Sequence, residues 1–348
     1  MKTIESRLAS ELRPCATVSE SDLHAQVASH SFCQGLNDEL VQRLTDCALR
    51  VHFDPDQIIF REGDMANRFY LIERGEIALE ATERDAKPTL LQTLGAGDVL
   101  GWSWLFPPYY YHFDARALKP TDAIFFYGTR LREVCEENPD LGYELLKRIS
   151  MILLRRLQAW TQELSEMTPA GGEPLPVPSP QRPDWTYDKS KKLDKLIADH
   201  PFFKTISPRH LAAITEAAQE KVFEPGELIV RQKDYANKFF VLEKGNVALE
   251  YAVPRDGSVP IQVMGAGDVF GWSWLFPPFT WHFQARALEY TRAVVLNGAK
   301  LLILCETNHS LGYELMRRVT EMVIQRLQAT RRQVLLLQRR ELATDSRS

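Results

Sequence analysis

The residue types best able to bind a ligand are concentrated in one stretch that occurs twice. It reads GAGDVLGWSWLFPPYYYHFDARAL over 95–118 and GAGDVFGWSWLFPPFTWHFQARAL over 265–288, 170 positions later. Its indole rings could stack on a ligand ring, and its hydroxyl, imidazole and guanidinium groups could hydrogen-bond an anion. The candidate ligand-binding residues are Gly101, Trp102, Ser103, Trp104, Tyr111, His112 and Arg116 in the first copy, and Gly271, Trp272, Ser273, Trp274, Trp281, His282 and Arg286 in the second.

The residues that acid–base catalysis would need do not occur in both copies. Two residues after the shared histidine, the first copy has Asp114 and the second has Gln284, so no histidine–carboxylate pair is common to both. No nucleophile or pair of carboxylates recurs either, and the five cysteines lack the CxxC spacing of a metal site. We therefore predict no enzyme activity, no catalytic residue and no bound metal.

Two interpretations of the repeated aromatic residues stay open. The alternating Trp102, Trp104 and Phe106 place three rings on one face of a short strand or turn, where they either fill the core or stack on a ligand. Arg116 and Arg286 are the best anion partners in the stretch, and surface salt bridges are the equally good alternative.

These residues belong to an internal duplication. The register holds without a gap from His30 and His200 to the ends of the long helical patterns, with roughly two in five aligned positions identical. A segment rich in proline and glycine separates the copies and is typical of a linker. We predict a tail at 1–29, a first domain at 30–167, a linker at 168–190, a second domain at 191–338 and a tail at 339–348.

The elements that must position the repeated stretch follow the same order in both copies. Helical spacing over 31–51 gives way to short runs rich in β-branched and aromatic residues, with turns at Arg74-Gly75 and Lys244-Gly245. Leucines spaced three or four apart then predict a long helix after each set of strands. The predicted fold is α+β and mainly β, with two tandem jelly-roll barrels, each flanked by N-terminal helices and a long C-terminal helix.

This order, together with particular glycines, resembles the cyclic nucleotide-binding domain of catabolite-activator-type regulators, kinase regulatory subunits and gated channels. The resemblance rests on FREGDMANRFYLIERGEIAL over 60–79 and GAGDVLG over 95–101, and it covers nearly all of both copies. It implies a small-ligand site at the repeated stretch and a long helix that caps the ligand or dimerises.

The repeated stretch departs from that family's phosphate-binding cassette in both copies alike. The family pattern is Gly-Glu-x-Ala followed by Arg-x-Ala, where the glutamate binds the ribose and the arginine binds the cyclic phosphate. Here tryptophan follows Gly101 and Gly271, and Tyr111 and Trp281 stand near the expected arginine. The prolines at 107–108 and 277–278 also remove two amide donors. The shared departure predicts sites adapted to a less polar or aromatic ligand.

The composition of the chain limits the kinds of partner that it is expected to bind. A net charge of −4 gives no general attraction to nucleic acid or to anionic lipid, and no apolar run is long enough to span a bilayer. The start of the chain lacks the apolar core of a signal peptide, and no helix-turn-helix pattern follows the second long helix. We expect a cytoplasmic, bacterial-type protein that binds neither DNA directly nor membranes.

The leading functional hypothesis is a regulatory protein that binds small molecules. It would need no cofactor other than a cyclic nucleotide or another small anionic or aromatic ligand. Its long helices would transmit the ligand state to a protein partner, would form a homodimer, or would pair within one chain. The alternatives are a scaffold protein that binds no ligand, and true cyclic AMP binding through a variant cassette.

Overall fold

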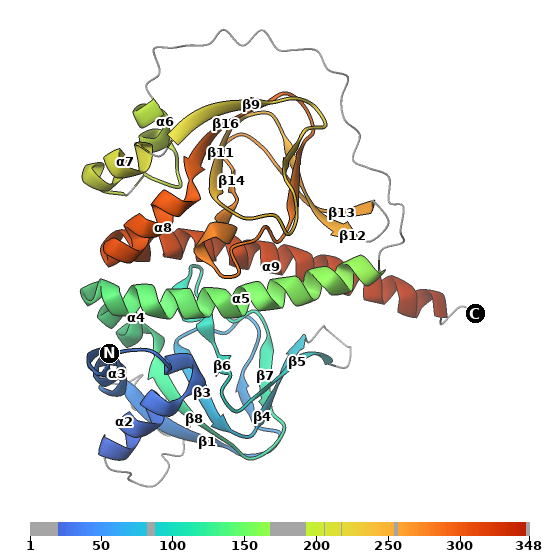
Figure 1. Ribbon diagram of the computed structural model, residues 1–348. Helices are drawn as coiled ribbons and strands as arrows, with labels where there is room; N and C mark the ends of the chain where they lie inside the picture. The colour runs from blue at the N-terminus through green and yellow to red at the C-terminus, as the bar shows by residue number, and fades with distance from the viewer. Residues whose placement is uncertain are drawn as a thin grey trace. The chain divides into compact units, whose positions relative to one another are not determined.

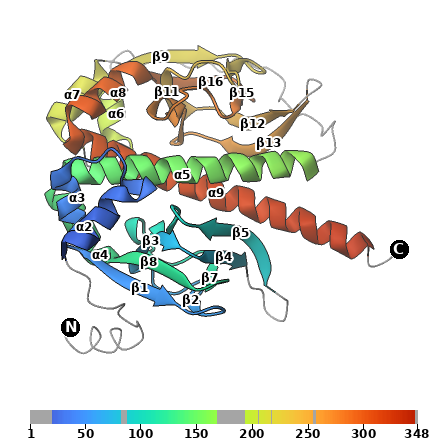
Figure 2. The same ribbon diagram turned by 60° about the horizontal axis from the view of Figure 1, so that its bottom comes forward.

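The computed structural model divides into two compact units, residues 1–145 and 146–348, and each is described by itself. Each unit carries its own β-sheets and helices (Figures 1 and 2). The expected linker at 168–190 and most of the expected N-terminal tail lie outside the described residues. Those are 20–81, 88–167, 193–204, 206–216, 218–253 and 257–345.

The first unit contains two four-stranded antiparallel sheets with the orders β1-β8-β3-β6 and β2-β7-β4-β5. Its strands are β1 (Ala48–Phe53), β2 (Ile58–Phe60), β3 (Arg68–Arg74), β4 (Glu76–Ala81), β5 (Thr89–Gly95), β6 (Val99–Leu100), β7 (Asp114–Ala117) and β8 (Thr121–Tyr127). The helical elements are α2 (Glu20–Ser29), the 3-10 turn η1 (Ser31–Cys33), α3 (Asp38–Thr45) and α4 (Gly128–Glu137).

The core of this unit lies between the two sheets. Alternate residues of each strand point inward, so Val51 and Phe53 of β1 belong to one apolar cluster with Ile77 and Leu79 of β4, a strand of the other sheet. Burying these side chains supplies most of the driving force for folding the unit. The predicted jelly-roll architecture, mainly β with flanking helices, is confirmed.

The predicted turn at Gly75 is a corner between the sheets. The strand before it, β3, pairs with β8, whereas the strand after it, β4, pairs with β7. Gly75 has a φ of +98°, and a Cβ there would lie 2.5 Å from the Thr121 Cα. Only glycine fits this corner, and Gly245 meets Thr291 in the same way in the second copy.

The helix predicted over 31–51 is shorter than expected. A 3-10 turn ends at Cys33, Gly35 takes a φ of +81°, and the α-helix begins only at Asp38, capped by the Asn37 side chain. The apolar residues from Ala48 onward belong to strand β1, because pairing with β8 buries them on one face. At these positions the pairing of β1 with β8, rather than the helical spacing of the apolar residues, determines the backbone conformation.

The second unit repeats this arrangement. Its sheets have the orders β14-β11-β16-β9 and β10-β15-β12-β13. The Ser207 side chain caps α7 (Pro208–Thr215), and Pro208 occupies the first turn of that helix. The strands are β9 (Ala218–Phe223), β10 (Leu228–Val230), β11 (Lys238–Lys244), β12 (Val247–Val253), β13 (Gly257–Met264), β14 (Val269–Phe270), β15 (Gln284–Ala287) and β16 (Thr291–Asn297); the helices are α6 (Leu193–Asp199), α7 (Pro208–Thr215), α8 (Gly298–Thr307) and α9 (His309–Asp345).

Helix α5 (Pro139–Met167) begins in the first unit, and its larger part belongs to the second. Within the second unit this part contacts α9. Ser150 Oγ lies 2.6 Å from Thr320 Oγ1, both side chains are fully buried, and the two residues are equivalent positions of the duplication. Lys147 Nζ donates to Glu306 Oε1 at 2.6 Å. Within the described ranges, no helix combines the length and the apolarity needed to cross a bilayer.

Two histidines at equivalent positions, His30 and His200, directly follow the first described helix of their copies. His30 Nδ1 accepts the Phe32 amide at 3.2 Å and its Nε2 lies 3.2 Å from the Ile72 carbonyl oxygen, and His200 Nδ1 accepts the Phe202 amide at 3.2 Å. Burial lowers the pKa of both imidazoles. A ring nitrogen that accepts an amide hydrogen carries no proton, so the folded chain keeps both rings neutral.

Acidification is therefore expected to destabilise the protein through these two residues. Below about pH 6.5 the unfolded chain protonates histidines that the folded chain keeps neutral, so the free energy of unfolding falls by up to about 1.4 kcal/mol per pH unit for each. The measurement is thermal melting from pH 7.5 to 5 for the wild type and for His30→Asn/His200→Asn. An equal loss of melting temperature in both proteins would contradict this assignment.

Candidate functional site

In each copy the WSWL segment of the repeated stretch forms a 3-10 turn, which is one of the two forms that the sequence allows. Gly101 and Gly271 adopt the left-handed conformation, and η2 (Trp102–Leu105) and η3 (Trp272–Leu275) follow them directly. A Cβ at position 101 would lie 2.5 Å from the Arg68 carbonyl oxygen, so the backbone approach requires glycine. Because a 3-10 helix has three residues per turn, Trp102 and Trp104 face different surroundings.

The second tryptophan of each turn fills the core. Trp104 is 0% exposed and Trp274 is 3% exposed. Trp104 packs against Phe69 with ring centroids 6.2 Å apart, and a Cβ at Gly128 would lie 2.6 Å from its Cβ. Helix α4 thus starts in direct contact with this indole. The core interpretation accounts for Trp104 and Trp274.

The first tryptophan of the second copy has different neighbours. Trp272 borders a cavity of about 20 Å³, which is room for about one water molecule. Four of the candidate residues line this cavity, namely Gly271, Trp272, Ser273 and Trp281. Its other lining residues are Val230, Leu249, Phe270, Phe283 and Arg326.

Arg326 enters this site from the long helix α9. Its guanidinium carbon lies 4.3 Å from the Trp272 ring centroid and 5.9 Å from that of Phe283. Nε donates to Gln262 Oε1 at 3.2 Å, and Nη2 lies 3.6 Å from the sulfur of Met264. The residue is only 6% exposed, and burial lowers its pKa to about 9. The site therefore holds a cation against an aromatic ring.

Ser273 and His282 form the polar side of the second-copy site. Ser273 Oγ lies 2.9 Å from His282 Nδ1, and burial lowers the pKa of the imidazole. The pair can offer either a hydroxyl or a ring N–H, depending on the tautomer. In the first copy His112 lies beside Trp102, with ring centroids 6.2 Å apart.

Aromatic rings stand near the place where the family pattern expects an arginine. Tyr111 stacks on Phe60 with ring centroids 3.6 Å apart, and its hydroxyl donates to the Arg68 carbonyl at 3.0 Å and accepts the Arg68 amide at 3.1 Å. Burial raises the pKa of this phenol. Trp281 is 6% exposed and lies near Phe240. These rings present apolar surface to the barrel interior.

Nearby acids pair with Arg116 and Arg286. Arg116 Nε donates to Glu80 Oε2 at 3.1 Å, and its Nη1 donates to Asp56 Oδ1 at 2.9 Å. Arg286 Nε lies 3.5 Å from Glu250 Oε2. For these two arginines the sequence left anion binding and salt bridges open, and the contacts in the structure are salt bridges.

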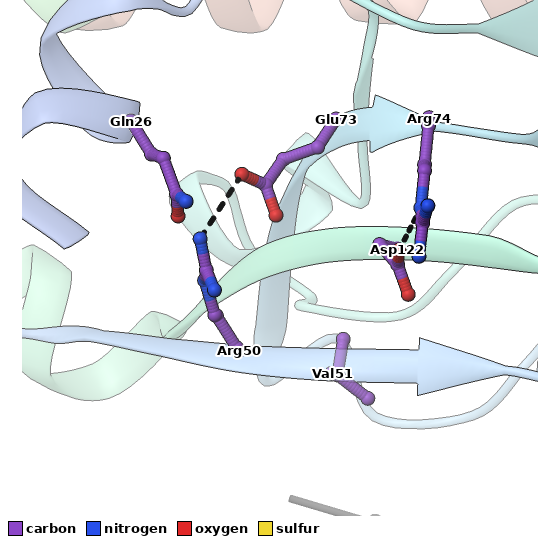
Figure 3. Close-up of a pocket in the computed structure, with 6 residues that line it drawn as sticks. All are labelled: Gln26, Arg50, Val51, Glu73, Arg74 and Asp122. Atoms are coloured by element: carbon purple, nitrogen blue, oxygen red, sulfur yellow. Dashed lines mark hydrogen bonds and ion pairs between the residues drawn. The ribbon is translucent and has the colours of Figure 1, made fainter. Parts of the chain in front are cut away.

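A larger pocket of about 270 Å³ lies outside the repeated stretch, between α2 and strands of the first unit (Figure 3). Across this pocket, Arg50 Nη2 lies 3.8 Å from Glu73 Oε1. Burial raises the pKa of Glu73. The other residues that line it are Gln26, Val51, Arg74 and Asp122.

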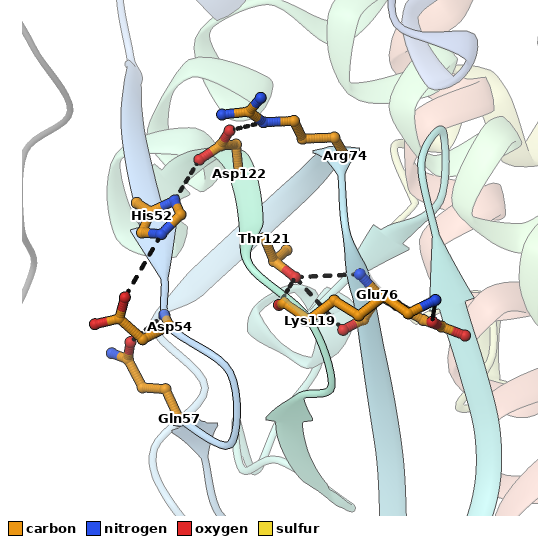
Figure 4. A network of polar contacts seen from close by, with 8 residues as sticks. All are labelled: His52, Asp54, Gln57, Arg74, Glu76, Lys119, Thr121 and Asp122. Atoms are coloured by element: carbon orange, nitrogen blue, oxygen red, sulfur yellow. Dashed lines mark hydrogen bonds and ion pairs between the residues drawn. The ribbon is translucent and has the colours of Figure 1, made fainter.

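A polar network continues from this pocket along the outer face of the sheet (Figure 4). Asp122 accepts from His52 Nδ1 at 2.6 Å and from Arg74. Burial alone would raise the pKa of Asp122, but these two hydrogen bonds together hold it below its usual value. In the second copy the charges at two of these positions are exchanged, because Arg292 replaces Asp122 and Glu220 replaces Arg50, and Arg292 binds Glu220 and Glu243. The exchange indicates a charge balance that stabilises the sheet rather than a shared binding site.

Among the described residues, no group of three or more histidine, cysteine, aspartate or glutamate side chains could hold a metal ion. Cys135 and Cys305 are 1% and 0% exposed and pack as small core residues. Burial raises the pKa of both thiols to about 12.

The model of the cyclic nucleotide-binding domain matches residues 50–138 and 220–308, which together make up more than half of the chain. The chain belongs to this family. Each matched segment contains one copy of the repeated stretch and the strands around it. The predicted resemblance is therefore confirmed, twice over in one chain.

Individual relatives are distant. A CRP-like cAMP-activated global transcriptional regulator of Mycobacterium tuberculosis is 25% identical over 40% of this chain and 61% of its own length. A cAMP-dependent protein kinase regulatory subunit of Neurospora crassa is 27% identical over 25% of this chain and 22% of its own. The cAMP-bound regulatory domain of Toxoplasma gondii PKA matches 84% of this chain and 94% of its own, with 14% identity and a TM-score of 0.31.

Sequence reasoning missed Arg326. The signal was present, because both copies read RLQA at the same point of the long helix, which puts Arg156 at the equivalent position. An arginine that recurs beside buried leucines breaks an otherwise apolar stripe. Arg156 is also buried, with 9% of its surface exposed.

Proposed function

We propose that this chain is a regulatory protein that binds a small ligand at the second repeated stretch and transmits the ligand state through helix α9. Its relatives include a transcriptional regulator and a protein kinase regulatory subunit, which supports the general role. The ligand and the partner are part of the proposal. The ligand is a small aromatic molecule rather than a cyclic nucleotide.

The single observation that carries the proposal is the position of Arg326. A residue of α9 lies on Trp272, inside the lining of the cavity that the repeated stretch forms. Because the cavity has room for only about one water molecule, an aromatic ligand that enters it must displace the guanidinium, and therefore favours one position of α9 over another. The site and the long helix are thus mechanically coupled within one unit.

The size of the cavity favours a second candidate function. About 20 Å³ cannot hold a nucleotide base, and the walls are packed aromatic rings. A scaffold protein whose barrels bind no ligand, and whose long helices assemble partners, would have such a closed site. The partner would be another protein or a second copy of this chain.

A thermal-shift screen separates these functions. We expect sodium benzoate or indole-3-acetate to raise the melting temperature and cyclic AMP and cyclic GMP to leave it unchanged, because the cassette glutamate and arginine are absent. A ligand at one hundred times its dissociation constant stabilises the folded state by about 2.7 kcal/mol.

The matched variant is Trp272→Ala, which should abolish the rise while the protein still melts cooperatively. A rise with cyclic AMP would instead support a variant nucleotide site. No rise with any compound would favour the scaffold.

We also infer a cytoplasmic location, with no direct contact to DNA or to membranes. The net charge of −4 supports this inference, because DNA-binding surfaces and surfaces that bind anionic lipid are basic.

A further inference from the structure

Arg326 is a buried cation for which the described part of the second unit supplies no ion-pair partner. Its contacts there are the Gln262 amide oxygen, the Met264 sulfur and two aromatic rings. The carboxylate whose charge acts on it is that of Asp268. Asp268 Oδ2 already accepts the Gly265 amide at 2.8 Å, within its own turn.

Such an arginine is costly to bury. Removing a guanidinium from water without a counter-charge is unfavourable, and a hydrophobic side chain of similar size would pack at lower cost. Gln262 compensates with one hydrogen bond to a neutral acceptor, Met264 with one weak contact, and the Trp272 and Phe283 rings with cation–π contacts. A residue kept at such a cost requires a reason other than stability.

The same arginine occurs in both copies, where the family's own phosphate-binding arginine is missing. Arg156 and Arg326 are 170 positions apart, and both are buried. Compared with the family pattern, each copy therefore lacks the arginine in the barrel and has an arginine on its long helix instead. Guanidinium groups recognise carboxylate and phosphate through a planar set of donors.

The surroundings of Arg326 favour an anionic group attached to a ring. Trp272, Trp281 and Phe283 line the cavity beside the guanidinium, and Ser273 adds a hydroxyl. The rings offer stacking surface, whereas the hydroxyl and the guanidinium offer donors to oxygen atoms. Arg286, the other arginine near this stretch, pairs with Glu250.

We propose that Arg326 is the anion-recognition residue of the second copy, and that its ligand is an aromatic molecule bearing a carboxylate. The carboxylate pairs with the guanidinium, which leaves the face of Trp272 as the ligand ring takes its place. This inference rests on the proposed function, that the second copy binds a small ligand. It assigns recognition of the carboxylate to helix α9 rather than to the strands and turns of the barrel.

The test compares benzoate with benzamide, which has the same ring and no charge. Calorimetric titrations use the full chain, with Arg156→Met in every protein so that the equivalent arginine does not contribute. Benzoate should bind the parent, and Arg326→Met should weaken that binding at least about tenfold. Arg326→Lys should restore part of it, because a lysine keeps the charge without the planar set of donors.

The matched control is Arg317→Met, which removes an exposed arginine from the same helix and should leave benzoate binding unchanged. If Arg326→Met does not fold, Arg326→Lys and the comparison of benzoate with benzamide still test whether Arg326 recognises the carboxylate. Equal binding of benzoate and benzamide, or binding that Arg326→Met leaves intact, would overturn the inference and leave the proposed function standing. Absence of benzoate binding to the parent would also overturn it. Benzoate binding that depends on Arg326 but never alters α9 or a partner would refute the proposed function alone.

Discussion

Replacing Trp104 by alanine is expected to lower the free energy of unfolding of the first unit by about 3–5 kcal/mol. The indole is completely buried, packs against Phe69 and touches the start of helix α4 at Gly128. Its removal leaves a cavity that a close-packed barrel cannot fill, because neighbouring strands are held by their hydrogen bonds. The measurement is urea unfolding, with the transition of each unit followed separately.

Two comparisons make this result specific. Tyr110→Ala, at a side chain that is 45% exposed, should change the stability by less than about 0.5 kcal/mol. Trp104→Phe should cost less than the alanine variant, because a smaller cavity remains. A loss below about 1 kcal/mol for Trp104→Ala would contradict the core assignment and return this tryptophan to the ligand interpretation.

Replacing Arg116 by methionine is expected to destabilise the first unit by about 2–3 kcal/mol. The change removes the main ion-pair partner of Glu80, whose side chain is 8% exposed. Glu80 also lies directly opposite Asp114 in the register of β4 and β7, so the variant leaves two acids facing each other. Because Arg116 itself is 28% exposed, solvent screening keeps the loss below that of a fully buried pair.

The second copy supplies the control for this prediction. There Gln284 replaces the second acid and donates to Glu250 Oε2 at 2.8 Å, so Glu250 keeps a partner when Arg286 is removed. Arg286→Met should therefore cost clearly less than Arg116→Met in the same urea experiment. Arg130→Met, in an exposed pair with Glu133 on α4, should have little effect. Equal losses for Arg116→Met and Arg286→Met would refute the role of Asp114.

Both predictions bear on the choice between a ligand site and a structural core. Trp104 and Arg116 were candidate ligand-binding residues because of their types and their repetition. Their contacts in the structure are those of a core ring and of a salt bridge. The residues that line the cavity of the second copy, with Arg326 added, are the part of the candidate set that the proposed function uses.

Much of the fold was predictable because it depends on local patterns that occur twice. Gly75 and Gly245 mark corners that only glycine can form, and Ser207-Pro208 marks the start of a helix. Alternating apolar residues predict strands whatever their partners are. With two copies to compare, these signals reinforce each other, and the family resemblance follows from them.

The contacts between distant residues could not be predicted in this way. The sequence alone determined the duplication, the order of helices and strands, the turn glycines and the absence of the family's glutamate and arginine from both cassettes. The tertiary structure decided that Trp104 is core, that Arg116 pairs with Glu80, and that Arg326 lies on Trp272. The physical reason is that periodicity tells which face of an element is buried, whereas the identity of the neighbours depends on how strands and helices far apart in the chain pack together.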